Sequence, residues 1–246
     1  MLVVISLIIV LMSLAVPAIN TMKSGSDFSQ AAYDMGGYLD QARSYAVANN
    51  TYVFVGITEV DGLKDDATLK ASGSAGVGRV VMVSAASKDG TKGYTVSGST
   101  VTVSLTSWPA GLTAIGKPLT FDNVHLMASL GAGTGRMQRV GVTTAYRIGD
   151  TTNISTLALK FGYPIGLSAT DANARYWLTR VLSFDPQGAL RYVYASGSGA
   201  GDSLPSQGYI EIGMIPSHGN ATVSPITNQA ALLFDCMSGN YRVYRP

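Results

Sequence analysis

Polar and apolar positions divide the chain into three stretches. Residues 1–22 contain no charged side chain and are apolar almost throughout. At 1.5 Å per residue, a helix of this length would span about 30 Å, the hydrocarbon thickness of a bilayer. Between residues 27 and 50, apolar and small side chains recur every three or four residues, which is the period of one helix face. After residue 50 the period falls to two, which predicts strands.

The first two stretches predict one long helix with two halves. Residues 1–22 would form a membrane-spanning half, and residues 23–50 an amphipathic half that packs on a sheet. The side chains expected to carry the first half are Leu2, Val3, Ile5, Leu7, Ile8, Leu11, Leu14, Pro17 and Ile19. Those expected to pack on the sheet are Phe28, Ala32, Met35, Leu39, Ala42 and Ala46. A secretory signal cleaved after Ala18 is the alternative for the first stretch, although the basic start typical of such signals is absent.

Segments rich in alternating apolar residues follow, separated by glycine-rich turns such as "SKDGTKG", "DPQG" and "MSGN". The predicted strands are 51–57, 79–85, 94–105, 155–161, 176–184, 189–195, 209–215, 230–234 and 241–245. Short strands without a second helical pattern predict an antiparallel sheet domain over residues 51–246. The expected fold class is therefore α+β, with a long N-terminal α-helix followed by an antiparallel β-sheet domain.

The composition narrows the range of functions. The chain carries 17 Lys and Arg against 15 Asp and Glu, a net charge of +2, so a nucleic acid partner is not expected. Cys236 is the only cysteine, which excludes an intrachain disulfide, and its apolar neighbours favour a buried side chain over a reactive thiol. With one cysteine and two histidines, a zinc site is not expected either. No segment predicts a cofactor.

One motif raises the question of catalysis. Residues 201–204 spell GDSL, the nucleophile block of a serine hydrolase family, and residues 122–125 have the Asp-x-x-His form of the same family. The two motifs stand in the reverse order here, and no strand-to-helix turn is predicted to present Ser203. We therefore interpret residues 201–204 as a loop and expect that the chain is not an enzyme and has no small-molecule substrate.

Two further segments have simple interpretations. Asp61, Asp65 and Asp66 share one acidic loop but lack the spacing of an EF-hand, so a solvated loop is favoured over a calcium site. The final segment "YRVYR" alternates tyrosine and arginine, a pattern that could contact a nucleic acid strand. Alternation on a sheet explains the same pattern without a ligand.

The order of an apolar segment, an amphipathic helix and a β-domain resembles type IV pilins and the pseudopilins of type II secretion. The segment "LVVISLIIVLMSLAVPAI" is similar to the prepilin N-terminus after its processing motif. "YLDQARSYAVANNTYVFV" resembles the helix-to-strand passage of H-type pseudopilins, with Arg43, Ala46 and Asn50 at the matching positions. "FDPQGALRYV" and "LLFDCMSGNYRVYR" are similar to the last strands of that domain. The middle is longer, and in this the chain resembles the larger prepilin-like proteins called Verru_Chthon cassette protein D.

The resemblance implies a pilin-like fold and a structural role rather than catalysis. The chain would be a minor pilin-like or pseudopilin-like subunit of a type IV pilus or a type II secretion filament, assembling through its N-terminal hydrophobic helix. Its partners would be other pilin or pseudopilin subunits, and inner-membrane lipid before assembly. It would cross the bacterial inner membrane once, with its C-terminal domain in the periplasm or on an extracellular filament.

The resemblance is incomplete at the start of the chain. The Gly-Phe junction and the glutamate of the prepilin processing motif, which precede N-terminal methylation in that family, are absent here. The alternative function is therefore an exported, membrane-anchored β-domain that acts as an adhesin or an envelope-binding module.

Overall fold

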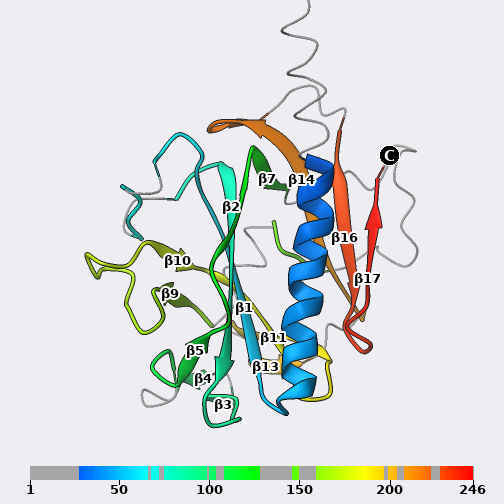
Figure 1. Cartoon of the computed structure of the whole chain (residues 1–246). Helices are drawn as coiled ribbons and strands as arrows, with labels where there is room; N and C mark the ends of the chain where they lie inside the picture. The colour runs from blue at the N-terminus through cyan, green and yellow to red at the C-terminus, as the bar shows by residue number, and fades with distance from the viewer. Residues whose placement is uncertain are drawn as a thin grey trace, which may run out of the picture.

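The computed structural model describes residues 28–65, 68–71, 75–98, 100–103, 108–127, 146–149, 159–196, 199–203, 208–222 and 228–245. In these residues two mainly antiparallel sheets and one helix enclose a common core (Figure 1). The helix comprises residues 28–48. It ends where Asn50 adopts a left-handed φ of 48° and the Thr51 N–H donates to the carbonyl of Ala46, a common way to close a helix.

The first sheet has the strand order β13-β12-β11-β1-β2-β5, and β6 also pairs with β2. Its long central pair, β1 and β2, is antiparallel and joined over the whole length of β1. The strand bounds are β1 Val53–Asp61, β2 Gly78–Ser87, β5 Leu112–Ala114, β6 Leu119–Asp122, β11 Arg180–Phe184, β12 Leu190–Ser196 and β13 Gly199–Ser203.

The second sheet has the order β15-β14-β16-β17, with β7 and β8 also pairing with β14. All of its pairs are antiparallel except β14 with β8. Its bounds are β7 Val124–Met127, β8 Tyr146–Arg147, β14 Tyr209–His218, β15 Ala221–Thr222, β16 Ala230–Asp235 and β17 Tyr241–Tyr244. Two separate hairpins complete the described strands: β3 Tyr94–Ser97 with β4 Thr100–Val103, and β9 Phe161–Tyr163 with β10 Tyr176–Leu178.

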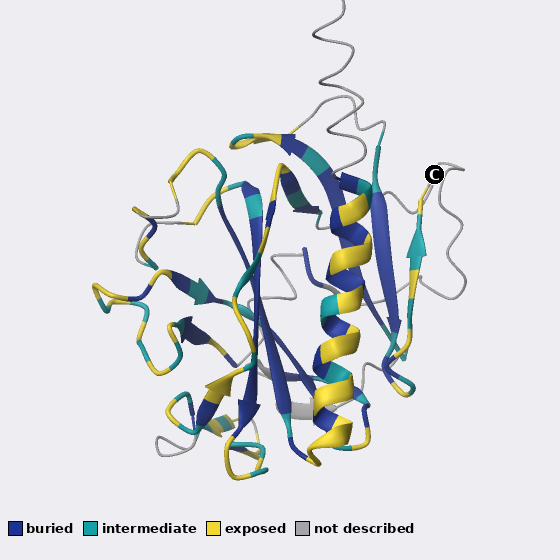
Figure 2. Ribbon diagram, in the orientation of Figure 1, coloured by how far each residue is buried: buried dark blue, intermediate teal, exposed yellow. Residues whose placement is uncertain are grey.

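The first sheet is buried on both faces. Val53, Val55 and Ile57 of β1 belong to the cluster that also holds the helix and the inner face of the second sheet. Phe54 faces the opposite side, where its ring meets Trp108 edge-on at 4.8 Å between centroids. Two-sided burial explains why "VFVGITEV" is apolar with little alternation (Figure 2).

The expected fold class, a long N-terminal helix followed by a sheet domain, is wrong. The described structure is mostly antiparallel sheet, and its helix is short, at residues 28–48. The physical reason is that most of the chain has a period of two, and one amphipathic helix is enough to close the core between the sheets. The apolar side chains proposed for the first half, from Leu2 to Ile19, lie outside the described residues.

The expected localisation as a single-pass inner-membrane protein is not supported. Within the part of the chain that the structure describes, no helix has the length and apolarity that crossing a membrane requires. The helix of residues 28–48 exposes Asp34 and Asp40 on its outer face. A charged side chain at the centre of a bilayer costs about 2.5–3.5 kcal/mol, which explains the result for this helix.

Cys236 lies fully buried in the common core, as its apolar neighbours predict. Burial raises the pKa of its thiol to about 12, and the nearby charge of Asp235 contributes to the same shift. An exposed thiol is about half ionised near pH 8.5, whereas this thiol stays protonated there. We expect a thiol reagent to leave the native chain unlabelled at that pH and to label it fully in guanidinium chloride. Prompt labelling of the native chain would contradict the buried position.

Candidate functional site

The helix presents a continuous buried stripe to both sheets. All six side chains that the sequence assigns to this contact are buried in the common core: Phe28, Ala32, Met35, Leu39, Ala42 and Ala46. Their spacing of three and four residues places them on one side of the helix, which is the dark side in Figure 2. Three of the six are alanines, so the helix axis can approach the strands closely.

Gly36 brings the helix against the last strand. A β-carbon at this position would lie 2.2 Å from Cε2 of Tyr241 on β17. The same strand is followed by Arg245, which donates to Ser29 Oγ and lies 5.6 Å from the centre of the Phe28 ring. The end of the chain is therefore attached along the first turns of the described helix.

Tyr38 attaches the helix to the first sheet. Its hydroxyl oxygen accepts a hydrogen bond from the Ser84 N–H on β2 at 2.8 Å, and lies 3.0 Å from Ser84 Oγ. Burial raises the pKa of the Tyr38 hydroxyl. This contact fixes the helix to β2, while Tyr241 fixes it to β17.

Arg43 joins the helix to two turns that are far apart in sequence. Its Nη1 donates to Asn240 Oδ1 at 3.2 Å and lies 3.7 Å from Asp40 Oδ1. The side chain runs over Gly188 and Gly239, where β-carbons would lie 3.1 and 2.6 Å from Arg43 atoms. Both glycines also have positive φ, a backbone conformation that other residues rarely adopt. Another residue at either position would therefore meet Arg43 and strain the turn.

The two turns under Arg43 are the "DPQG" and "MSGN" segments. In the first, Asp185 Oδ1 accepts from the N–H groups of Gln187 and Ala189 at 3.0 and 2.9 Å. The turns are joined through the Leu190 N–H, which donates to the Cys236 carbonyl at 2.8 Å. The segments "FDPQGALRYV" and "LLFDCMSGNYRVYR" therefore meet at one place in the fold, together with the helix.

The opposite side of the helix is exposed. Tyr33 is 56% exposed, Val47 50% and Tyr45 38%. The other exposed positions from Gln30 to Ala48 are small or polar. The exposed positions form the yellow side of the helix in Figure 2. We refer to the exposed residues between 30 and 48 as the outer helix face.

The hydrolase motifs do not assemble as a catalytic group. Ser203 ends β13, the edge strand of the first sheet, whereas His125 lies on β7, which pairs with β14 of the second sheet. His125 pairs with Glu59 rather than with Asp122, and the Asp122 carboxylate accepts from Arg79. Among the described residues, no group of three or more His, Cys, Asp or Glu side chains could hold a metal ion.

Glu59 is the centre of a polar cluster that the sequence analysis missed. Its Oε1 lies 2.7 Å from His125 Nδ1 and accepts from the Gly78 N–H at 3.1 Å. Arg180 is close enough that the charge of Glu59 raises the pKa of its guanidinium, although burial lowers that pKa by more. The pair of Glu59 and His125 connects β1 of the first sheet to β7 of the second. The only sequence signal was a carboxylate within an apolar strand.

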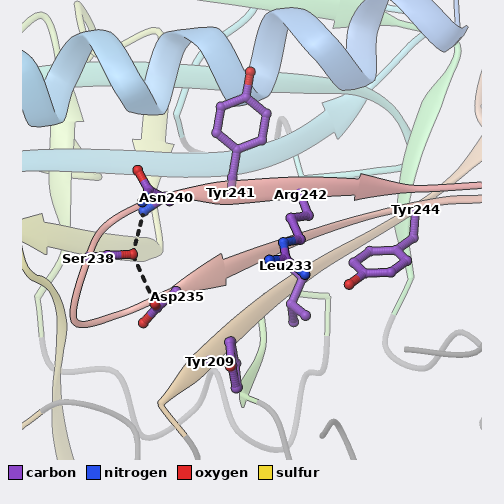
Figure 3. Close-up of a pocket in the computed structure, with 8 residues that line it drawn as sticks. All are labelled: Tyr209, Leu233, Asp235, Ser238, Asn240, Tyr241, Arg242 and Tyr244. Carbon is purple, nitrogen blue, oxygen red and sulfur yellow. Dashed lines mark hydrogen bonds between the residues drawn. The ribbon is translucent and has the colours of Figure 1, made fainter. Parts of the chain in front are cut away.

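The outer surface of the second sheet carries a cavity (Figure 3). A cavity of about 190 Å³ lies over β14, β16 and β17. Its lining residues are Tyr209, Leu233, Asp235, Ser238, Asn240, Tyr241, Arg242 and Tyr244. We refer to it as the tyrosine groove. Tyr241 points away from it toward the helix, whereas Tyr209 and Tyr244 lie on the side of Leu233.

Comparison with known proteins gives no relative: no family model, no curated protein and no solved structure matches the chain.

Proposed function

We propose that this chain is a structural, pilin-like or pseudopilin-like subunit of a filament. The observation that carries the proposal is the helix of residues 28–48, whose inner stripe is buried along its whole length while its outer face stays open. Eight residues, 20–27, separate the apolar sequence of residues 1–19 from this helix. Other subunits of the same or a related kind would contact the outer helix face and that apolar sequence.

The attachment of the helix supports this role. A subunit that repeats in a filament must present its contact surface in one fixed orientation, because each head-to-tail contact copies the one before it. Besides the contact of Arg245 with Ser29, three contacts hold this helix: Gly36 against Tyr241, Tyr38 on Ser84, and Arg43 over two turns. They act at different heights of the helix and on both sheets, so rotation or sliding of the helix would break at least one of them.

The residues of the outer helix face favour contact with another subunit over full exposure to solvent. Two tyrosines and a valine are exposed on it, and tyrosine is enriched at the cores of protein interfaces. Gly37 lies between them with no heavy atom within 4 Å of a β-carbon placed there. A neighbouring subunit could therefore approach the helix closely at that position.

Site-specific photo-crosslinking tests the proposal in the producing organism. A benzophenone amino acid would replace Tyr33, Gln41 or Ser44 of the outer helix face, one at a time, in the full-length chain. Lys117, an exposed residue between β5 and β6, supplies the control position. We expect ladders of crosslinked subunits from the helix positions, enriched in the sheared filament fraction, and no ladder from Lys117. If the chain remained monomeric with the crosslinker at each of the three helix positions, the proposal would be overturned.

A further inference from the structure

The tyrosine groove has an apolar floor and two aromatic walls. Leu233 of β16 is buried, with Tyr209 of β14 and Tyr244 of β17 packed against it. Arg242 stands opposite Leu233 in the register of β16 and β17. Figure 3 shows its side chain extending toward Leu233, across the space between the tyrosines.

The acceptor oxygens at one end of the groove are already used by the turn that follows β16. Asp235 Oδ1 accepts from the Met237 N–H at 3.0 Å, and Asp235 Oδ2 accepts from Ser238 Oγ at 2.8 Å. Ser238 Oγ accepts in turn from the Asn240 N–H at 3.3 Å. Asn240 Oδ1 accepts from Arg43. The carboxylate at this end is therefore largely satisfied by its own turn.

The groups left over can all donate a hydrogen bond, and the two tyrosine hydroxyls can also accept one. Within the described residues, Arg242 and the hydroxyls of Tyr209 and Tyr244 have no hydrogen-bond partner, and neither has the side-chain amide nitrogen of Asn240. Arginine has five donors and no acceptor, and its fork matches a carboxylate. A groove with free donors, one cation and two aromatic walls favours a ligand with many acceptors, one negative charge and an apolar face.

We propose that the tyrosine groove binds a uronic acid unit of an acidic polysaccharide. The sugar carboxylate would pair with the Arg242 guanidinium, and its ring oxygens and hydroxyls would accept from Tyr209, Tyr244 and Asn240. The C–H face of the sugar ring would lie over Leu233 and against the tyrosine rings. At about 190 Å³ the cavity is smaller than the 300–1,000 Å³ usual for larger ligands, which matches a single sugar ring.

Two other ligand classes fit the groove less well. An extended peptide binds a sheet through main-chain groups at an open edge, but β16, which forms the floor, is paired on both sides by β14 and β17. A nucleic acid strand needs a row of cations along its phosphates. Among the described residues that line the groove, Arg242 is the only basic one, and nearby Arg245 is engaged with Ser29 and Asn228.

Calorimetric titration of the full-length chain with trigalacturonate and trimannuronate tests this proposal. The methyl ester of trigalacturonate, which keeps the sugar and loses the charge, is the matched ligand control. We expect the Arg242→Gln substitution to weaken binding of the acids by about 10- to 100-fold, as the loss of a charged hydrogen bond predicts. Tyr244→Ala should weaken binding of acid and ester alike. Lys117→Gln, which also removes one positive charge, should leave the affinity unchanged.

Several outcomes would overturn the proposal: no binding of either acidic trisaccharide, equal affinity for the acid and its ester, or an Arg242→Gln variant that binds as the parent does. Tighter binding of oligothymidylate than of the acids, lost in the same variant, would assign the groove to nucleic acid instead. Because Tyr244 packs on Leu233, circular dichroism of each variant would check the fold. None of these measurements depends on filament assembly. The groove can therefore bind sugar in a chain that forms no filament, and a filament subunit can have a groove that binds no sugar.

Discussion

Replacing Leu39 with alanine is expected to lower the free energy of unfolding by about 3–5 kcal/mol. Leu39 is fully buried at the middle of the inner stripe, within the cluster shared by the helix and both sheets. Removing its side chain leaves a cavity that strands paired on both sides cannot close. A loss of this size is a large fraction of the 5–15 kcal/mol that stabilises a typical domain. Urea denaturation followed by circular dichroism would measure it.

The matched control is Gln41→Ala on the same helix. Gln41 is exposed, and alanine has slightly better helix propensity than glutamine, so the unfolding free energy should change by less than about 0.5 kcal/mol. Similar midpoints for Leu39→Ala and the parent chain would show that the stripe does not carry the stability of the core. Similar midpoints would also weaken the proposed function, because a loosely held helix could not fix the orientation of its outer face.

The part of the fold that the sequence predicts is the part with a regular period. The stripe from Phe28 to Ala46 is buried because its spacing fits one helix face, and the segments 79–85 and 209–215 lie within β2 and β14. The predicted strand 94–105 is instead a hairpin, since Gly98 adopts a φ of 58° between β3 and β4. The sequence pattern predicts no strand in residues 112–127, because β5, β6 and β7 are short and interrupted by Gly, Pro and Asn.

The candidate sites were harder to predict, because their members are distant in sequence. His125 meets Glu59 across 66 positions, and Arg43 meets Asn240 across 197. No local period links such residues, and only the pairing of the sheets brings them together. Arg242 and Tyr244 were visible as an alternating pattern, but the donor excess of the groove depends on Asp235 being satisfied within its own turn. That satisfaction is a property of the folded turn rather than of the residue type.

Two neighbouring glycines of the helix should respond in opposite directions to the same substitution. Gly36→Ala is expected to destabilise the chain by about 1–3 kcal/mol, because the new methyl group would overlap the Tyr241 ring and force it to move. That ring is also packed on Phe234, at 5.5 Å between centroids, so its movement disturbs the core. Gly37→Ala meets no atom within 4 Å and should stabilise the helix by about 0.5–1 kcal/mol.

A double-mutant cycle with Tyr241→Ala separates packing from helix propensity. Without the ring, Gly36→Ala should lose its penalty and become stabilising, as Gly37→Ala is, so the coupling energy between the two sites should be large. Urea unfolding of the four chains would measure it. Equal effects of the two glycine substitutions in the parent chain would contradict a close helix–β17 contact. If the coupling is found, Gly36 is a glycine because the last strand must reach the helix, whereas Gly37 is free to serve the outer helix face.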